Sequence, residues 1–284
     1  MSWRQELGRR RRAAVAELIR RAWRYAEQAA PITADTPAGR RFAAFGSGSL
    51  IAFPSGSVYG ERWIEIGSGS MFAASVTLCA GMAPGHDLGP SPVLRVGDRC
   101  VIGRGSHIVA HYSLDIGDDV YTGPYVYITD QNHSYADPDA PIGAQWPVNS
   151  AVSIGSGSWI GTGAIILPGA VIGQNVVVAA GAVVRGKIPD RCVVAGIPAR
   201  VVRQHVPGVG WTTPPDPAGA GPATAAADAA DAAGASAAAS DVAGAAEAAG
   251  AADAADAAGA VLGDGAPPPP VPPVPEPIPA PAQP

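Results

Sequence analysis

The segment TDQNHSYADPDAPIGAQWPVN, residues 129–149, holds the side chains best suited to chemistry in this chain. Its histidine, His133, carries an imidazole that titrates near neutral pH, so it can take up or release a proton during a reaction. Asp130 lies three residues earlier, and its carboxylate could orient the imidazole and stabilise the protonated ring. An exposed loop histidine without a role is the alternative interpretation of His133.

A six-residue spacing of aliphatic side chains surrounds this segment and predicts the elements that position it. The spacing fits neither an α-helix, with a period of about 3.6 residues, nor a simple strand, with a period of about two. A small or apolar residue lies two positions before each aliphatic one, and Gly usually follows it. Short strands that meet at a corner every six residues predict a solenoid. The clearest row is Ile154, Ile160, Ile166, Ile172, Val178 and Val184.

The same spacing continues toward the N-terminus in blocks of three positions, which predicts three strands per coil. The blocks begin 30, 20, 38 and 18 residues apart, so a coil of 18 residues leaves excesses of 12, 2 and 20. These excesses predict loops near residues 79–93, 109–113 and 129–151, and the longest contains His133. The positions in these blocks are Ile66, Phe72, Leu78, Val96, Ile102, Ile108, Ile116, Thr122 and Ile128, of which only Thr122 is polar.

Four further histidines are distributed along the chain. His107 directly precedes a predicted buried position, so its side chain should point outward, and His111 lies at the next corner. Either side chain could reach across a groove between subunits. We expect His86 and His205 to be solvated.

The first residues predict an amphipathic helix over residues 4–29, with eight arginines among the first 24 residues. We expect this helix to cap the open first coil of the solenoid or to pack against copies of itself. Peripheral contact with an anionic membrane surface is the alternative. We expect no binding to nucleic acid, because no recognised nucleic-acid motif accompanies the helix.

The composition changes sharply near residue 212 of the 284-residue chain. From there to the end the chain is nearly all Ala, Pro, Gly and Asp, with nine acidic residues and no Lys or Arg, so residues 1–211 are net +4 although the whole chain is −5. The last residues should adopt polyproline II, and we expect the whole tail to be disordered. The predicted segments are a basic helix and linker (1–43), a solenoid domain (44–205) and a tail (206–284).

Cysteine usage and hydropathy bear on the compartment. The three cysteines show neither disulfide nor metal-ligand spacing, and neither a signal-peptide core nor a run of 18 apolar residues is present. We expect a soluble cytoplasmic protein, at the inner face of the membrane if the basic helix attaches there.

The repeat of aliphatic-Gly-x4, together with WIGTGAIILPGAVIG (159–173) and AGIPARVVR (195–203), resembles the hexapeptide-repeat acyltransferases. Within them it is most similar to the galactoside and maltose O-acetyltransferase group, over roughly residues 44–205. The resemblance implies an all-β solenoid, a left-handed parallel β-helix, with an N-terminal capping helix. It also implies a homotrimer with acetyl-CoA in the groove between neighbouring subunits.

The resemblance further implies transfer of an acetyl group from acetyl-CoA to a hydroxyl, which we expect on a sugar or glycan precursor, without a metal. His133 would be the general base that removes the hydroxyl proton. The acceptor pocket would involve Asn132, Tyr135, Asp137, Gln145, Trp146 and His111. The positions that match the contacts of the family with coenzyme A are Trp159, Thr162, Ala180, Arg185, Arg200 and Arg203.

The arginines among these residues differ in how well they match. The guanidinium groups of Arg200 and Arg203 suit the phosphates of the coenzyme. Relatives usually have Thr followed by Lys where this chain has Arg185-Gly186-Lys187, which weakens the assignment of Arg185.

Two other functions fit the same fold. A solenoid scaffold would use the basic helix and the proline-rich tail to recruit partners. A zinc enzyme of the carbonic anhydrase type would need three histidines around the metal, but the spacing of His107, His111 and His133 does not match that family.

Overall fold

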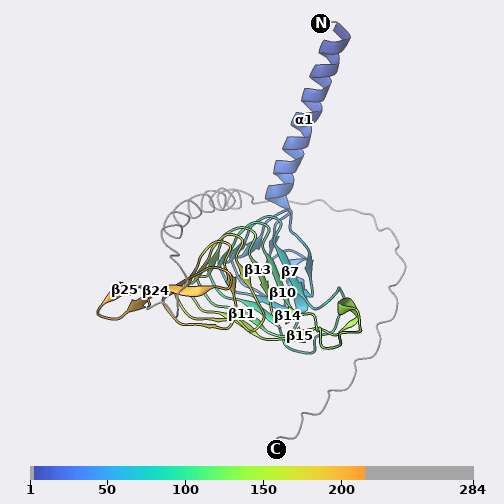
Figure 1. Ribbon diagram of the computed structural model, residues 1–284. Helices are drawn as coiled ribbons and strands as arrows, with labels where there is room; N and C mark the ends of the chain where they lie inside the picture. Colours follow the sequence, from blue (N-terminus) through green and yellow to red (C-terminus); the bar gives the residue numbers. More distant parts are fainter. Residues whose placement is uncertain (1–2, 215–284) are drawn as a thin grey trace, which may run out of the picture. The chain divides into compact units, whose positions relative to one another are not determined.

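The computed structural model describes residues 3–214, and its solenoid consists of three β-sheets that the chain visits in a fixed order (Figure 1). The chain passes from the first sheet to the second, then to the third, and back to the first, so that each circuit forms one coil. Strands of successive coils pair in parallel, as Ile108 with Ile128 in the third sheet. The predicted fold class, an all-β solenoid of the left-handed parallel β-helix type with one N-terminal helix, is confirmed.

Most strands of the three sheets are two to four residues long, as corners every six residues require. The first sheet contains β2 (Ala44–Phe45), β5 (Ile64–Ile66), β8 (Leu94–Val96), β11 (Leu114–Ile116), β16 (Val152–Ile154), β19 (Val171–Ile172) and β22 (Lys187–Ile188). The second contains β1 (Ile32–Thr33), β3 (Leu50–Ile51), β6 (Met71–Phe72), β9 (Val101–Ile102), β12 (Tyr121–Thr122), β17 (Trp159–Ile160), β20 (Val177–Val178), β23 (Cys192–Ala195), β24 (Arg200–Val206) and β25 (Gly210–Thr212). The third contains β4 (Val58–Tyr59), β7 (Thr77–Ala80), β10 (His107–Ala110), β13 (Tyr127–Thr129), β18 (Ile165–Ile166) and β21 (Val183–Val184).

The core is the inside of the prism, and it is built from the six-residue spacing. All fifteen side chains predicted for the inward row are buried, and none is more than 4% exposed. Removal of these apolar groups from water stabilises the stacked coils. The polar exception, Thr122, is also accommodated, because its Oγ1 accepts a hydrogen bond from the backbone N–H of Gly103 at 2.9 Å.

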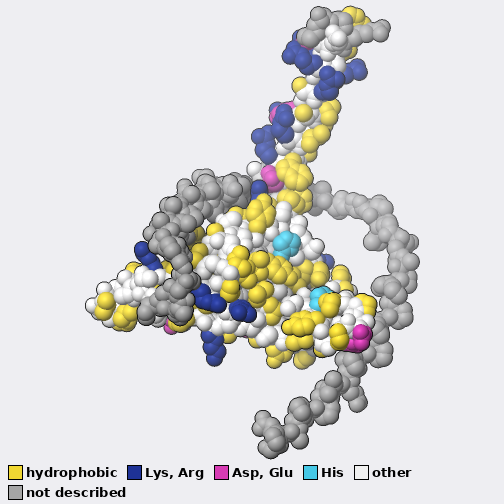
Figure 2. All heavy atoms as spheres, in the orientation of Figure 1, with side chains coloured by type: hydrophobic (Ala, Val, Ile, Leu, Met, Phe, Trp, Pro, Cys, Tyr) yellow, Lys and Arg dark blue, Asp and Glu magenta, His cyan; other side chains and the backbone are white. Residues whose placement is uncertain are grey.

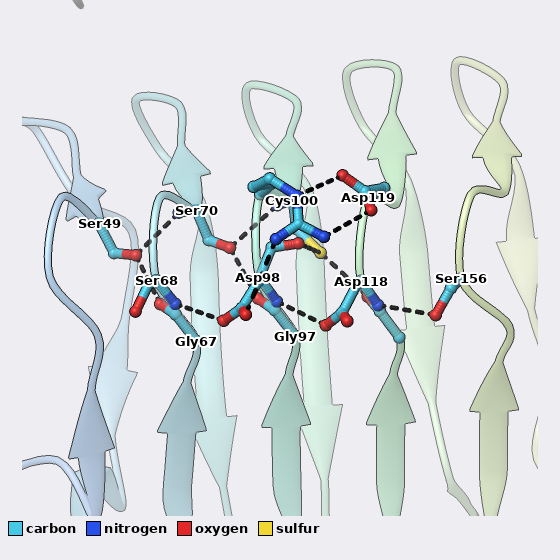
Figure 3. Close-up of polar contacts among 12 residues, drawn as sticks. Ser49, Gly67, Ser68, Ser70, Gly97, Asp98, Cys100, Asp118, Asp119 and Ser156 are labelled. Carbon is cyan, nitrogen blue, oxygen red and sulfur yellow. Dashed lines mark hydrogen bonds and ion pairs between the residues drawn. The ribbon is translucent and has the colours of Figure 1, made fainter.

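The turns between the first and second sheets stack in register, and their side chains bond from one coil to the next (Figure 3). Asp98 accepts the backbone N–H of Ser68 at 2.7 Å, and Asp118 accepts the N–H of Asp98 at 2.8 Å. Ser156 then accepts the N–H of Asp118 at 3.0 Å. These bonds satisfy turn N–H groups that the strand ladders leave unpaired.

The predicted helix is present as α1 (Trp3–Ala29). Its apolar side chains remain exposed, for example Leu18 at 67% and Ile19 at 63%, so the helix does not lie over the first coil of its own chain. Residues of the predicted linker close that end instead. Strand β1 pairs antiparallel with β3, and the ring of Phe42 packs edge-on against Phe45 with the centroids 5.1 Å apart.

The other end of the solenoid is closed by antiparallel strands. The chain turns back after β23, and β24 pairs with β23 and then with β25. Regular structure therefore continues beyond residue 205, where we predicted the solenoid domain to end. The prediction of a disordered tail with a polyproline end falls largely outside the described residues. Among residues 3–214, no helix is long and apolar enough to cross a membrane.

Three 3-10 helices lie between the strands: η1 (Gly39–Arg41), η2 (Glu61–Trp63) and η3 (Ile142–Ala144). The last of them belongs to the loop that contains His133.

Candidate functional site

The three predicted loops all leave the solenoid at one corner, where the third sheet leads back to the first. They join β7 to β8, β10 to β11 and β13 to β16, and these strands are neighbours in their respective sheets. The loops 81–93, 111–113 and 130–151 therefore stack on successive coils. We name this feature the loop corner.

Asp130 holds the loop corner together from inside. The residue is fully buried, and its two carboxylate oxygens accept the backbone N–H groups of His111, Tyr112 and Ser113, each at 2.8 Å. Three N–H donors on one carboxylate fix the short loop above it. We predicted that Asp130 would orient the ring of His133. In the structure both of its oxygens accept backbone N–H groups, so its observed contacts hold the short loop, and a role toward His133 stays a prediction.

The long loop leaves and returns through a narrow neck. The N–H of Ser150 donates to the carbonyl of Asp130 at 2.7 Å, and β14 (Gln131–Asn132) pairs antiparallel with β15 (Val148–Asn149). His133 follows β14 directly, so the neck determines where its backbone leaves the solenoid. The side chain of His133 is exposed.

The predicted acceptor residues in this loop divide into two groups. Tyr135 and Trp146 expose 78% and 52% of their surface, and Asn132 is also exposed, so these side chains are available to a ligand. Gln145 instead supports the loop. Its Oε1 accepts the N–H of Asp137 at 3.1 Å, and its Nε2 donates to the carbonyls of Asp137 and Ala140 at 2.9 and 3.2 Å. The bonds of Gln145 show a structural role within the loop, and its contact with an acceptor stays a prediction.

Stacking of the loops brings three histidines together as a histidine cluster, which comprises His86, His111 and His133. Burial of the ring lowers the pKa of His111 below its usual value, and charge on His86 or His133 acts in the same direction. The Asp130 carboxylate and a hydrogen bond with the Gly81 backbone oppose that shift. His111 is consequently neutral near pH 7, which limits repulsion within the cluster.

We expect the free energy of unfolding to decrease as the pH falls below about 6.5, the ordinary pKa of histidine. Because the pKa of His111 is lowered in the folded protein, the unfolded chain takes up this proton first. The stability is complete above the ordinary pKa and is lost as the pH falls through the lowered value. The variant His111→Gln should lose this part of the pH dependence in urea unfolding, whereas His107→Gln controls for loss of a histidine. Identical profiles for His111→Gln and wild type would contradict this expectation.

His86 is a cluster member that we predicted to be solvated. It is only partly exposed, and its Nδ1 accepts the N–H of Met82 at 3.3 Å. The sequence did hold a signal for this placement. The loop with His86 follows the third inward position of its coil, Leu78, just as the other two loops follow Ile108 and Ile128.

The residues matched to coenzyme A contacts gather mainly at a different corner, between the second and third sheets. Thr162 and Ala180 occupy stacked turns there, linked by the bond from Gly181 N–H to the Thr162 carbonyl at 2.9 Å. The segment before Arg200 forms the next layer, because the N–H of Ala199 donates to Val183 at 2.8 Å. We name this feature the coenzyme corner.

The other matched residues take different places. Trp159 lies beside the coenzyme corner on the second sheet, paired with Val177, and Arg203 lies further along β24. Arg185 follows β21 and therefore lies on the side of the loop corner. One chain thus places its histidine cluster and its coenzyme corner at opposite edges of the third sheet.

His107 begins β10 at the coenzyme edge, whereas His111 follows the end of the same strand. Four residues of extended strand separate the two backbones by about 13 Å. The three histidines that a zinc enzyme would use do not converge within one chain. Among the described residues no group of His, Cys, Asp and Glu has the arrangement of a metal site.

A groove of about 620 Å³ runs over the first sheet, away from the predicted residues. It is lined by Glu65, Arg95 and Asp115, among others, and Arg95 forms ion pairs with Glu65 at 3.2 Å and with Asp115 at 3.3 Å. These charges neutralise one another across the strands. The groove contains none of the residues predicted for the site.

Comparison with known proteins finds the same repeat in a described family. The family "Bacterial transferase hexapeptide (six repeats)" matches residues 151–186. The Mycobacterium tuberculosis protein "Probable acetyltransferase Rv3034c" is 37% identical over 112 residues, which are 39% of this chain and 37% of that protein. The Escherichia coli protein "Putative lipopolysaccharide biosynthesis O-acetyl transferase WbbJ" is 36% identical over 106 residues, which are 35% of this chain and 54% of that protein. The chain thus spans roughly a third to a half of these relatives.

Solved structures show a weaker likeness. A mutant of AntD, an N-acyltransferase from Bacillus cereus in complex with dTDP and coenzyme A, aligns with 61% of this chain and 91% of its own, at 17% identity and a TM-score of 0.49. A likeness of this degree carries no argument about chemistry. The family match rests on the repeat itself: residues 151–186 carry the hexapeptide repeat of bacterial transferases, and the resemblance of this chain to the hexapeptide-repeat acyltransferases is confirmed.

Proposed function

We propose that this protein is an acyltransferase that moves an acetyl group from acetyl-CoA to a hydroxyl of a sugar or glycan precursor, in the cytoplasm. The transferase repeat and the acetyltransferase names of the two curated relatives support the reaction class. The name of the Escherichia coli relative supports oxygen as the acceptor atom and a glycan as its carrier.

The loop corner is the observation that carries the proposal. A repetitive solenoid offers few places for chemistry, and here the three predicted loops leave the repeat at one corner, which carries an exposed histidine. The exposed rings of Tyr135 and Trp146 on the same loop supply flat apolar surfaces that suit a sugar.

His133 would act as the general base of the transfer. Its unprotonated ring nitrogen takes the hydroxyl proton as the hydroxyl oxygen forms a bond to the thioester carbonyl carbon. The carbon–sulfur bond then breaks, and the departing thiolate of coenzyme A takes the proton from the imidazolium. The acetyl ester and free coenzyme A are the products, so atoms and charge balance without a further reactant.

The burial of the three cysteine thiols agrees with direct transfer of the acetyl group in a ternary complex of enzyme, acetyl-CoA and acceptor. Cys79, Cys100 and Cys192 are all buried, and burial raises the pKa of each thiol. A covalent acyl-enzyme on cysteine would need an exposed thiolate, which none of these residues provides.

We further propose that the active unit is a homotrimer whose sites are shared between copies. The loop corner and the coenzyme corner lie at opposite edges of the third sheet, so the loop corner of one copy would complete the coenzyme corner of the next. The outward side chains favour association through the second sheet rather than the first. They are mainly apolar on the second sheet, for example Met71, Val101 and Trp159, whereas the first sheet carries the charged groove.

The test is release of coenzyme A from acetyl-CoA by the purified full chain, with sugars, amino sugars and nucleotide sugars as acceptors. We expect turnover with acceptors that offer only hydroxyl groups. Turnover restricted to amino sugars would contradict oxygen as the acceptor atom. If no acceptor gives turnover, calorimetry with coenzyme A distinguishes the two remaining functions. A chain that does not bind coenzyme A would be a scaffold and not an acyltransferase.

A further inference from the structure

Helix α1 exposes an apolar face that the rest of residues 3–214 does not cover. Val15, Leu18, Ile19 and Tyr25 have exposed fractions of 55%, 67%, 63% and 72%. Leu18 and Ile19 follow Val15 by three and four residues, and Tyr25 follows Leu18 by seven, so the four lie along one side of the helix. Helix stability in water comes mainly from packing of such a face, so an occupant for it is expected.

The opposite side of the same helix is basic. Over Trp3–Ala29 the chain has eight Arg and three Glu, which gives a net charge of +5. Glu17 forms ion pairs with Arg20, Arg21 and Arg24 at 3.1, 3.0 and 3.6 Å, so these four charged residues share one face. In Figure 2 the basic side chains of this helix, all Arg, lie along one side in its middle part with hydrophobic side chains on the other, and lie on both sides near its N-terminal end.

The distribution of Arg decides between two occupants, further copies of α1 and a lipid surface. Four consecutive arginines, Arg9–Arg12, are spread around most of the helix circumference, because each residue turns by about 100°. Arg11 therefore comes on the apolar side, near Leu18. In a parallel bundle of copies this charge would meet its equivalents at the shared interface, which is unfavourable. At a membrane surface the same side chain extends along its stem to the lipid phosphates.

We propose that α1 binds an anionic membrane surface, with its apolar face in the interface and its arginines on the lipid phosphates. The features fit this environment: a long helix with a charged face that includes Arg20, Arg21 and Arg24, and an apolar face that includes Tyr25. The ring of Trp23 also lies 5.6 Å from that of Phe53, so the base of the helix contacts the solenoid. This proposal is independent of the acyl transfer proposed above.

The test is sedimentation of the full chain with phosphatidylcholine vesicles that either contain or lack phosphatidylglycerol. We expect binding only to the anionic vesicles, reduced more than about tenfold when Arg20, Arg21 and Arg24 are all changed to Gln, since each Arg near such a surface contributes to binding. The double variant Leu18→Ser with Ile19→Ser should abolish binding.

A matched control is Ala13→Ser, which introduces the same hydroxyl on the basic side of the helix and should bind like the wild type. Light scattering gives the molar mass of each variant and so distinguishes a lipid surface from further copies of α1 as the occupant. If the wild-type protein does not sediment with anionic vesicles, the proposal is overturned. If the Leu18 and Ile19 double variant also lowers the molar mass, the face joins copies of the chain instead. Urea unfolding of each variant at the wild-type midpoint would show that the solenoid itself is intact.

Discussion

The variant His133→Ala should lower kcat/KM for acceptor acylation by about 10²–10⁴-fold, the usual cost of losing a general base. A hydroxyl attacks a thioester poorly unless its proton is removed as the new bond forms. Coenzyme A binding, measured by calorimetry, should be unchanged, because His133 lies on the loop corner and not among the residues of the coenzyme corner. The expected signature is loss of turnover with retained affinity for the donor.

A second variant in the histidine cluster, His111→Gln, tests whether His133 and not His111 is the general base. Charge on His133 acts to lower the pKa of His111, and with its lowered pKa His111 is unprotonated near pH 7. If His111→Gln abolishes turnover while His133→Ala does not, the base is His111. If both variants keep full activity, the loop corner is not the catalytic corner.

The repeat is the part of the molecule that sequence predicted well. Inward positions need only a side chain that can be buried, so the apolar side chains reveal the six-residue period directly. The period then assigned the polar Thr122 to an inward position, and Thr122 is buried. The excess lengths also located all three loops. The sequence also contained their common corner, since each loop follows the third inward position of its coil. Loops at the same position in successive coils stack, which places His86 close to His111.

Roles that depend on the direction of a hydrogen bond could not be predicted in the same way. The sequence places Asp130 near His133, but proximity along the chain does not show whether a carboxylate faces a ring or backbone N–H groups. Gln145 is a similar case, because its amide serves the carbonyls of Asp137 and Ala140. The amphipathic pattern of α1 likewise showed an apolar face without showing what covers it.

We expect Asp130→Ala to reduce the free energy of unfolding by about 3 kcal/mol, a larger cost than most polar substitutions produce. The carboxylate is fully buried and accepts the N–H groups of His111, Tyr112 and Ser113. Truncation to alanine leaves these donors without their acceptor, next to a small void. Urea unfolding at a fixed protein concentration measures the change, since association of copies would make apparent stability depend on concentration.

Asp118→Ala is the matched control, because its carboxylate also accepts a turn N–H, that of Asp98 at 2.8 Å, but at an exposed corner. One exposed bond of this kind contributes about 1 kcal/mol. Equal destabilisation by the two variants would contradict the role of Asp130 in holding the loop corner. An Asp130→Asn protein with wild-type stability and lost turnover would instead support pairing of this carboxylate with His133. Stability and turnover of the Asp130 variants therefore distinguish a carboxylate that builds the corner from one that acts on the base.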